Sequence, residues 1–273
     1  MLLHLIATPS DCPNSGIEKK WQRGVQAVGV VIIIGSGPGA LQSRDWRRSS
    51  SQTIVAINNA WQVRPDWDYL IHPEDFPINR RPRLFKTDQK TICANDYVPL
   101  QNQFGGFVYA GGTMAFTAAY WALAALKPRV IAMIGCDMVY PQTGPTHFYG
   151  QGTADPLRDD ITLRSLEAKS ARLLALASQS NCALVNLSNA QTSRLIYPRA
   201  VHSSLNSVRP IKFQSSLIER ALRAEARANY MVPNGRYWKV ADQFDPKVID
   251  QIDQLWLDVA EHIMLNNDLS EAI

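Results

Sequence analysis

The hydrophobic and polar positions of the chain fall into blocks that predict strands alternating with helices. The first block, residues 28–34, is dominated by β-branched residues and ends at Gly35, which suits a strand buried on both faces of a sheet. Further strands are expected at residues 53–57, 68–71, 107–110, 129–134 and 183–187. Residues 77–103 are polar, contain prolines and have no strong period.

Two helices are expected between these strands. Residues 113–126 carry no charge and are rich in alanine, which favours a helix, and their lack of a polar face requires that helix to be buried. A second helix is expected from about residue 160 to residue 180. This alternation predicts an α/β fold with a doubly wound, mostly parallel sheet of the Rossmann-like type.

Beyond residue 190 the pattern changes to helices and loops. Ser216 and Glu219 have the spacing of a capping box and predict the start of a helix, and Asp245 followed by Pro246 predicts the start of another. The last helix has one apolar stripe, formed by Val248, Ile249, Ile252, Leu255, Trp256, Val259 and Ile263. The chain therefore divides into an irregular lead-in (1–27), an α/β domain (28–200) and a helical C-terminal lobe (201–273).

The composition is that of a globular protein: of 273 residues, 46% are hydrophobic and 19% are charged. The net charge of +4 suits a phosphorylated small molecule as ligand and does not require nucleic acid, which we do not expect as a partner. Four widely spaced cysteines without a C-x-x-C pair disfavour a zinc site or a disulfide framework and predict reduced cysteines.

Two further features bear on the location of the protein. The first residues lack the basic and hydrophobic regions of a signal peptide, and the longest apolar stretch, residues 113–126, is shorter than the ~20 residues of a membrane span. Together with reduced cysteines, these features predict a cytoplasmic protein with no membrane span. The sequence leaves open whether the chain forms a homo-oligomer.

A glycine-rich turn directly follows the first expected strand; its residues are Gly35, Ser36, Gly37, Pro38, Gly39 and Ala40. Glycines there let the backbone approach a ligand closely, and free N–H groups at the start of the next helix favour an anion such as a phosphate. The alternative is a tight turn between strand and helix that binds no ligand.

The spacing of this turn also fits the dinucleotide-binding fingerprint. That fingerprint needs an acidic residue at the end of the second strand, where this chain has Asn58 and Asn59, and Pro38 lacks the N–H that the turn would use. An NAD or FAD site is therefore disfavoured. A Walker loop is excluded, because no Lys-Ser or Lys-Thr follows the glycines.

Four short pieces of the chain carry a resemblance when they are taken in order. The first is the strand followed by Gly35-Ser36-Gly37-Pro38, and the second is the strand ending in Asn58-Asn59. The third is the helix that begins at Gly111-Gly112-Thr113, together with the next strand, which ends in Gly135-Cys136-Asp137. The fourth is the helix from Asp160 and the strand to Leu187, followed by Ser188-Asn189. Together they resemble the bacterial sialyltransferases of glycosyltransferase family 42 and the related flagellin-glycosyltransferase and pterin-diphosphokinase-like proteins.

The resemblance implies a modified GT-A-like α/β fold and a metal-independent transferase that uses a CMP-activated sugar as donor. It places the nucleotide on the turn of residues 35–38 and on Asn58, and we expect Asn59, Gly112, Thr113 and Asp137 beside it. The chain departs from the family at Ser36, where the family has asparagine. It also has Met-Val-Tyr after Asp137 where the family has Phe-Tyr, so the tyrosine that steadies the leaving phosphate is displaced by one position.

Sugar transfer to a hydroxyl needs a base for the acceptor proton and a group that neutralises the departing phosphate. His147 lies in a loop beyond the strand that ends at Asp137, where open α/β sheets place their ligands, and an imidazole with a pKa of ~6.5 accepts a proton at neutral pH. Tyr140 and Tyr149 are candidate hydrogen-bond donors to the phosphate. The alternative for His147 is a structural or surface histidine.

His72, Glu74 and Asp75 follow the third expected strand, and with Asp137 they could hold a hard cation such as Mg²⁺. No D-x-D motif directly follows any strand, so we expect no metal and no cofactor, only a nucleotide-sugar donor and an unknown hydroxyl-bearing acceptor. One alternative is an ATP- and Mg²⁺-dependent diphosphokinase of the hydroxymethylpterin type, which would need these carboxylates. The other is a non-catalytic nucleotide-binding module.

Overall fold

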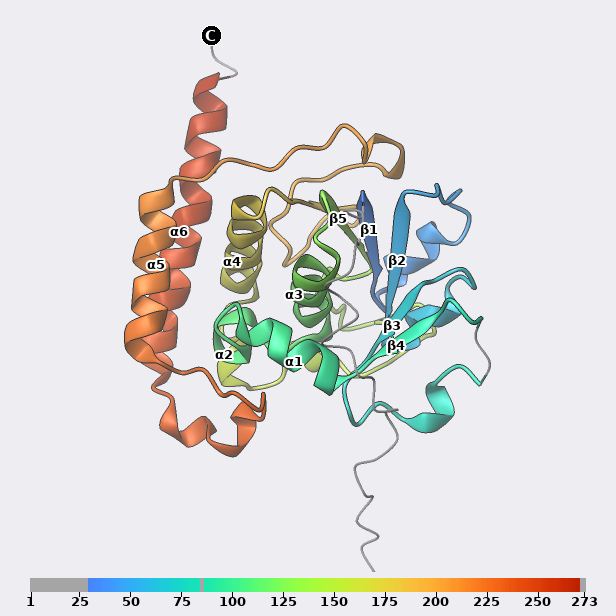
Figure 1. Cartoon of the computed structure of the whole chain (residues 1–273), viewed down its shortest axis with the longest axis horizontal. Helices are drawn as coiled ribbons and strands as arrows, with labels where there is room; N and C mark the ends of the chain where they lie inside the picture. The colour runs from blue at the N-terminus through green and yellow to red at the C-terminus, as the bar shows by residue number, and fades with distance from the viewer. Residues whose placement is uncertain (1–28, 84–85, 271–273) are drawn as a thin grey trace, which may run out of the picture.

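The computed structural model describes residues 29–83 and 86–270, and its centre is a six-stranded sheet in which all neighbouring strands are parallel (Figure 1). The strands are β1 (Val30–Ile34), β2 (Gln52–Ile57), β3 (Tyr69–Ile71), β4 (Lys90–Ile92), β5 (Val130–Ile134) and β6 (Ala183–Asn186). Their order is β4-β3-β2-β1-β5-β6, so the chain winds outward in both directions from β1. The prediction of a doubly wound parallel α/β sheet is confirmed.

Helices cover one face of this sheet in two layers. They are α1 (Ala94–Asn102), α2 (Phe107–Ala110), α3 (Met114–Leu126), α4 (Leu166–Gln179), α5 (Ser215–Ala228) and α6 (Pro246–Ser270). In Figure 1, α3 and α4 lie next to the sheet, and α5 and α6 form an outer layer against α4. The buried side chains of the sheet, of α3 and α4, and of the C-terminal helices form one continuous cluster.

The other face of the sheet is covered differently. Its buried cluster joins β1, β2 and β5 to short 3-10 helices at Pro38–Ser43 and Asn58–Gln62 and to Leu205 in the segment after β6. The strands are therefore buried on both faces, which explains why their sequences are continuous apolar runs.

The buried helix predicted at residues 113–126 is confirmed as α3. The Thr113 hydroxyl accepts the Phe116 N–H at 3.3 Å and so caps the first turn, and the helix ends at Lys127, whose φ of 47° is left-handed. An uncharged helix is stable here because it lies between the sheet and the other helices.

Residues 107–110 form the short helix α2, so the strand predicted there is wrong. The Gly111 N–H donates to the Phe107 carbonyl at 2.9 Å, and Gly106 and Gly111 have φ values of 80° and 90° that turn the chain at each end. A short, fully buried apolar run has no period that separates strand from helix, and tertiary packing decides.

Two other boundaries differ from those expected. Residues 77–103, expected to lack a strong period, contain β4 and α1, and the Asp96 carboxylate accepts the Cys93 N–H at the start of α1. The helix expected from residue 160 begins at Leu166, because Asp160 caps a separate 3-10 turn and Ser165 caps α4. The apolar pattern predicts one helix here, but the caps at Asp160 and Ser165 divide it into a short 3-10 turn and α4.

The start signals of the last two helices have different outcomes. Helix α5 begins at Ser215, so Ser216 lies inside it and the predicted capping box is wrong. The Asp245 carboxylate accepts the Lys247 N–H at 2.8 Å before α6, as predicted. Of the expected stripe, Ile249, Ile252, Trp256 and Val259 are buried, whereas the side chain of Ile263 and the lead-in 1–27 lie outside the described residues.

The described cysteines are in two states. Cys136 and Cys182 are buried free thiols, whereas Cys93 is disulfide-bonded, so the prediction of reduced cysteines is wrong for Cys93. Cys12 lies outside the described residues. Over the part of the chain that the structure describes, no helix combines the length and apolar character needed to cross a membrane.

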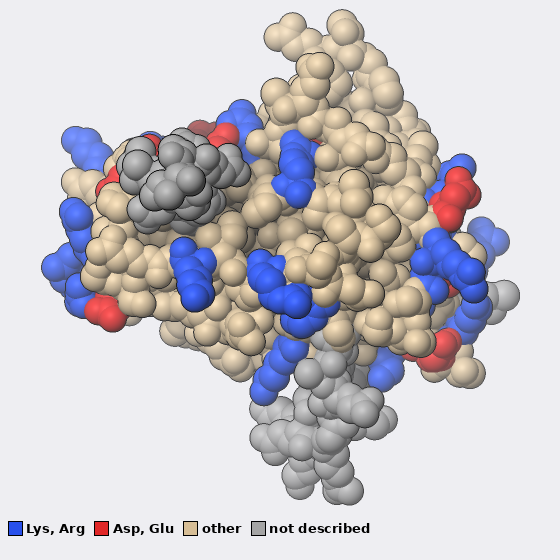
Figure 2. Space-filling model, turned by 90° about the horizontal axis from the view of Figure 1, so that it is seen from above, with Lys and Arg blue, Asp and Glu red and all other residues tan. Residues whose placement is uncertain are grey.

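On the face that Figure 2 shows, most charged side chains of the described residues are Lys and Arg, and some of them lie next to one another near the middle and at the right edge.

A buried charged network joins the C-terminal helices to the α/β unit. The Arg172 guanidinium in α4 contacts the Glu225 carboxylate of α5 at 2.7 and 2.8 Å and donates to the Tyr120 hydroxyl at 2.7 Å. The Trp256 indole N–H of α6 donates to the same carboxylate at 2.7 Å. Helices α3, α4, α5 and α6, from both layers, thus share one satisfied ion pair in the interior.

We expect Glu225→Gln to lower the free energy of unfolding by about 3–5 kcal/mol, because it leaves the Arg172 charge buried without its carboxylate. Urea denaturation measures this loss. The matched control is Glu219→Gln, which removes an exposed ion pair with Arg223 in the same helix and should cost at most ~1 kcal/mol. Equal losses in the two variants would contradict the structural role of Glu225.

Candidate functional site

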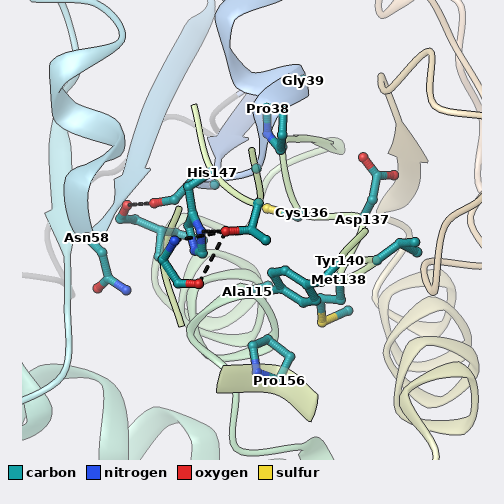
Figure 3. Close-up of a pocket in the computed structure, with 18 of the residues that line it drawn as sticks. Pro38, Gly39, Asn58, Ala115, Cys136, Asp137, Met138, Tyr140, His147 and Pro156 are labelled. Atoms are coloured by element: carbon teal, nitrogen blue, oxygen red, sulfur yellow. Dashed lines mark hydrogen bonds between the residues drawn. The ribbon is translucent and has the colours of Figure 1, made fainter. Parts of the chain in front are cut away.

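A cavity of about 1000 Å³ lies at the carboxyl ends of β1, β2 and β5 (Figure 3). Its walls are the turn after β1, the loop after β2, the first turn of α3, the loop after β5 and the turn after β6. The chain leaves β1 toward one edge of the sheet and β5 toward the other. Open α/β sheets bind their ligands at such a switch point.

The cavity brings together most of the residues singled out in the sequence. Those that line it are Gly35, Ser36, Gly37, Pro38, Asn58, Asn59, Thr113, Asp137, Tyr140, His147 and Tyr149. Gly112 lines an adjoining second cavity together with Glu74 and Asp75, and His72 lines neither cavity. Most of the residues indicated by the sequence therefore line one cavity, and Gly112, Glu74 and Asp75 line the cavity next to it.

The glycines of the turn pack directly against the end of β5. The Gly35 N–H donates to the Ile134 carbonyl at 2.8 Å, and the Gly37 N–H donates to the Gly135 carbonyl at the same distance. A Cβ on Gly37 would lie 2.8 Å from the Gly135 oxygen. Gly35 and Gly37 are thus required for a close backbone contact, and their amides are already hydrogen-bonded.

Other amides of the cavity wall have no acceptor among the described residues. They belong to Ser36 and Gly39 in the turn after β1 and to Met114 and Ala115 in the first turn of α3. The N–H groups of a helix's first turn point along its axis, and the helix dipole adds a partial positive charge there. These four amides, rather than those of Gly35 and Gly37, are available to an anion.

Asn58 follows β2 in a left-handed conformation, with φ of 52°. Its Oδ1 atom is buried and has no hydrogen-bond partner among the described residues, although the residue lines the cavity. A buried amide oxygen without a partner costs free energy unless a ligand or water satisfies it. The Asn58 amide oxygen is therefore available to a ligand in the cavity.

His147 is held by the hydroxyl of its neighbour Thr146. The Thr146 Oγ1 accepts the Gly152 N–H at 2.9 Å, lies 3.2 Å from the Gly152 carbonyl oxygen and 2.9 Å from His147 Nδ1. A hydroxyl has one proton, so all three contacts are satisfied only if Thr146 donates to Gly152 and His147 Nδ1–H donates to Thr146. This assignment leaves Nε2 with its lone pair free to accept a proton.

Burial lowers the pKa of His147 below its usual value, so its imidazole is neutral at neutral pH. The ring of Tyr149 stacks on it with centroids 5.0 Å apart, and the ring of Tyr140 lies 6.0 Å away. Burial, together with Cys136 and nearby acidic groups, raises the pKa of Tyr140 well above its usual value. The Tyr140 hydroxyl therefore keeps its proton and can donate a hydrogen bond.

Asp137 is engaged within the protein. Its Oδ1 accepts the Asn186 amide at 3.1 Å and lies 4.0 Å from the Arg199 guanidinium, while its carbonyl accepts the Arg194 N–H at 2.9 Å. These contacts join the loop after β5 to the segment after β6. Burial raises the pKa of the neighbouring Cys136 thiol, which excludes a thiolate nucleophile at neutral pH.

Several lining residues were not singled out in the sequence. They are Gln42, Phe76, Arg80, Met114, Ala115, Thr146, Gly152, Thr153, Asp155 and Pro156, among others. Arg80 is the cavity's one Lys or Arg within the described residues. It lies in the polar stretch without a strong period, so no pattern in the sequence points to it.

The residues considered for a hard cation are not assembled. No three His, Cys, Asp or Glu side chains in residues 29–83 and 86–262 are close enough to hold a metal ion. His72 is 2% exposed with Nδ1 2.8 Å from the Pro73 carbonyl, and the Glu74 carboxylate lies 3.6 Å from Arg236. Neither group joins Asp137.

Two alanine substitutions in the turn test the packing of its glycines. Gly37→Ala should destabilise the protein by about 1–3 kcal/mol, because its Cβ would press on the Gly135 backbone. Gly39→Ala is the control, since its Cβ would meet nothing closer than 3.6 Å and its φ is not left-handed. Urea denaturation of both variants compares them, and an equal effect would show that the contact with β5 is not close.

The chain matches no protein-family model, no curated protein and no solved structure. The chemistry of the cavity therefore rests on the residues that line it. They offer a ligand four backbone amides that have no acceptor, the buried Asn58 oxygen that has no partner, and the neutral imidazole of His147 with a free acceptor nitrogen.

Proposed function

We propose that the chain is a glycosyltransferase that binds a sugar activated by a nucleoside monophosphate, of the CMP type, and transfers the sugar to a hydroxyl group. The observation that carries this proposal is that one cavity has open backbone N–H groups and also His147, whose Nε2 is free to accept a proton. The first feature suits a phosphate and the second suits a general base.

The charge of the cavity supports a donor with few phosphates. Among the described residues that line the cavity, Arg80 carries a positive charge, and Asp137 and Asp155 each carry a negative charge. A sugar linked through one phosphate places a single negative charge at the amides. ATP would place several negative charges there and needs Mg²⁺, for which the described residues offer no cluster of carboxylates. The choice of cytidine as base rests on the resemblance of the turn.

In the proposed reaction the acceptor hydroxyl gives its proton to His147 Nε2. Its oxygen forms a bond to the anomeric carbon, and the bond from that carbon to the phosphate oxygen breaks. The electron pair leaves on the phosphate, where the amides of Met114 and Ala115 and the Tyr140 hydroxyl donate hydrogen bonds. Donors aimed at developing charge in a partly enclosed site lower the barrier more than they would in water.

Ligand-dependent thermal stability tests the donor class. CMP at 100 times its Kd should stabilise the protein by about 2.7 kcal/mol, and EDTA should not change this. UDP and ATP are compared under the same conditions. Stabilisation by ATP that EDTA abolishes would favour the diphosphokinase instead, and stabilisation by CMP without any turnover of a CMP-activated sugar would leave a binding module.

Substitution of His147 tests the base. His147→Ala should reduce hydrolysis or transfer of a CMP-activated sugar by about 10²–10⁴-fold while CMP still stabilises the protein. Thr146→Val should lower kcat because it removes the tautomer-fixing hydroxyl, and Thr146→Ser should retain it. Because burial lowers the pKa of His147, the fall of kcat/KM on acidification should occur at a lower pH than the titration of an unburied histidine. Undiminished turnover in His147→Ala would remove the assignment.

A further inference from the structure

A second cavity of about 530 Å³ adjoins the first, and Asn58, Met114 and Asp155 line both. Its walls come from the loop after β3, from α1 and α2, from the start of α3 and from residues 234–238 before α6. The two cavities therefore form neighbouring compartments, and the proposed reaction uses only the first.

One wall of the second cavity is aromatic. The rings of Tyr97, Phe107, Tyr237 and Trp238 follow one another with successive centroid distances of 6.3, 6.2 and 5.4 Å. Trp238 is 59% exposed, so its indole remains available to a ligand. An exposed tryptophan is the aromatic side chain that binds a cation best.

The charged groups of this cavity carry an excess of carboxylates. Glu74, Asp75, Asp155 and Asp160 line it together with the guanidinium groups of Arg158 and Arg236, so carboxylates exceed guanidinium groups by two. Within the described residues, Asp75 has no ion pair. The cavity is therefore complementary to positive charge.

The two arginines of the cavity do not cancel this excess. Arg158 is held by Asp155 at 2.7 Å and by Asp160 at 2.9 Å, and it also donates to the Gly112 carbonyl and the Tyr237 hydroxyl. Arg236 lies 3.6 Å from Glu74 alone. Burial raises the pKa of Tyr97, and the negative charges of Glu74 and Asp75 raise it further, so both carboxylates act on the aromatic wall.

We propose that this second cavity binds an organic cation, an alkylammonium group held over the Trp238 ring and paired with the Asp75 carboxylate. A neutral ligand of the same shape would leave the excess of carboxylates uncompensated. The assignment of this compartment to the acceptor, which would then carry an amine as well as a hydroxyl, rests on the proposed function. The binding of the cation itself does not.

Titration calorimetry with choline and with 3,3-dimethyl-1-butanol, its uncharged analogue of equal shape, tests the proposal. Choline should bind in a saturable manner and at least tenfold more tightly than the alcohol. Trp238→Ala and Asp75→Asn should each weaken choline binding at least tenfold, and Trp238→Phe should restore most of it because a ring remains. Asp242→Asn, an exposed acid outside both cavities, should have no effect.

Equal binding of choline and the alcohol, no choline binding, or choline binding unchanged in both Trp238→Ala and Asp75→Asn would overturn the proposal. Thermal denaturation of each variant shows that it is folded. CMP stabilisation is measured on the same samples, so the two proposals fail separately. Choline binding without any CMP effect would sink the donor assignment alone, and CMP stabilisation without choline binding would sink this inference alone.

Discussion

The close contact between the turn after β1 and the end of β5 fixes the position of that turn and of the loop that carries His147. Gly37 donates to the Gly135 carbonyl at 2.8 Å, and the absence of a Cβ on either residue lets the two backbones approach. The Ser36 carbonyl then accepts the Phe148 N–H at 3.0 Å. The backbone contact with Gly135 therefore positions the turn, and the hydrogen bond between Ser36 and Phe148 then holds the loop that carries His147.

Much of the fold follows from residue pattern alone, because short apolar runs and an uncharged alanine-rich helix are stable only inside a covered parallel sheet. Helix α3 and strands β1, β2, β3, β5 and β6 are of this kind. Helix α2 and strand β4 are not: one is a single buried turn without a period, and the other is three residues long and exists through its pairing with β3. The local sequence of a strand does not indicate which other strand it will pair with.

The candidate site divides in the same way. Composition and order place Gly35, Asn58 and His147 near one edge, since residues that follow parallel strands collect there. Sequence cannot show which amides are already bonded. In the structure the amides of Gly35 and Gly37 have acceptors, whereas those of Ser36, Gly39 and the first two residues of α3 have none among the described residues. It also cannot show that Thr146 fixes the tautomer of His147, because that depends on the return of the chain at Gly152.

The C-terminal segment influences the site through the start of α3 rather than through its long helices. Helices α5 and α6 pack against α4 and are fixed there by the Glu225 network. The Tyr237 hydroxyl instead donates to Asp160 at 2.9 Å, and Asp160 holds the Thr162 hydroxyl that receives the Gly112 N–H. Because Gly112 lies two residues before Met114, this chain of hydrogen bonds fixes the direction in which the open amides of α3 point. The same Tyr237 belongs to the aromatic wall of the second cavity, so one side chain takes part both in this wall and in the hydrogen bonds that hold the start of α3.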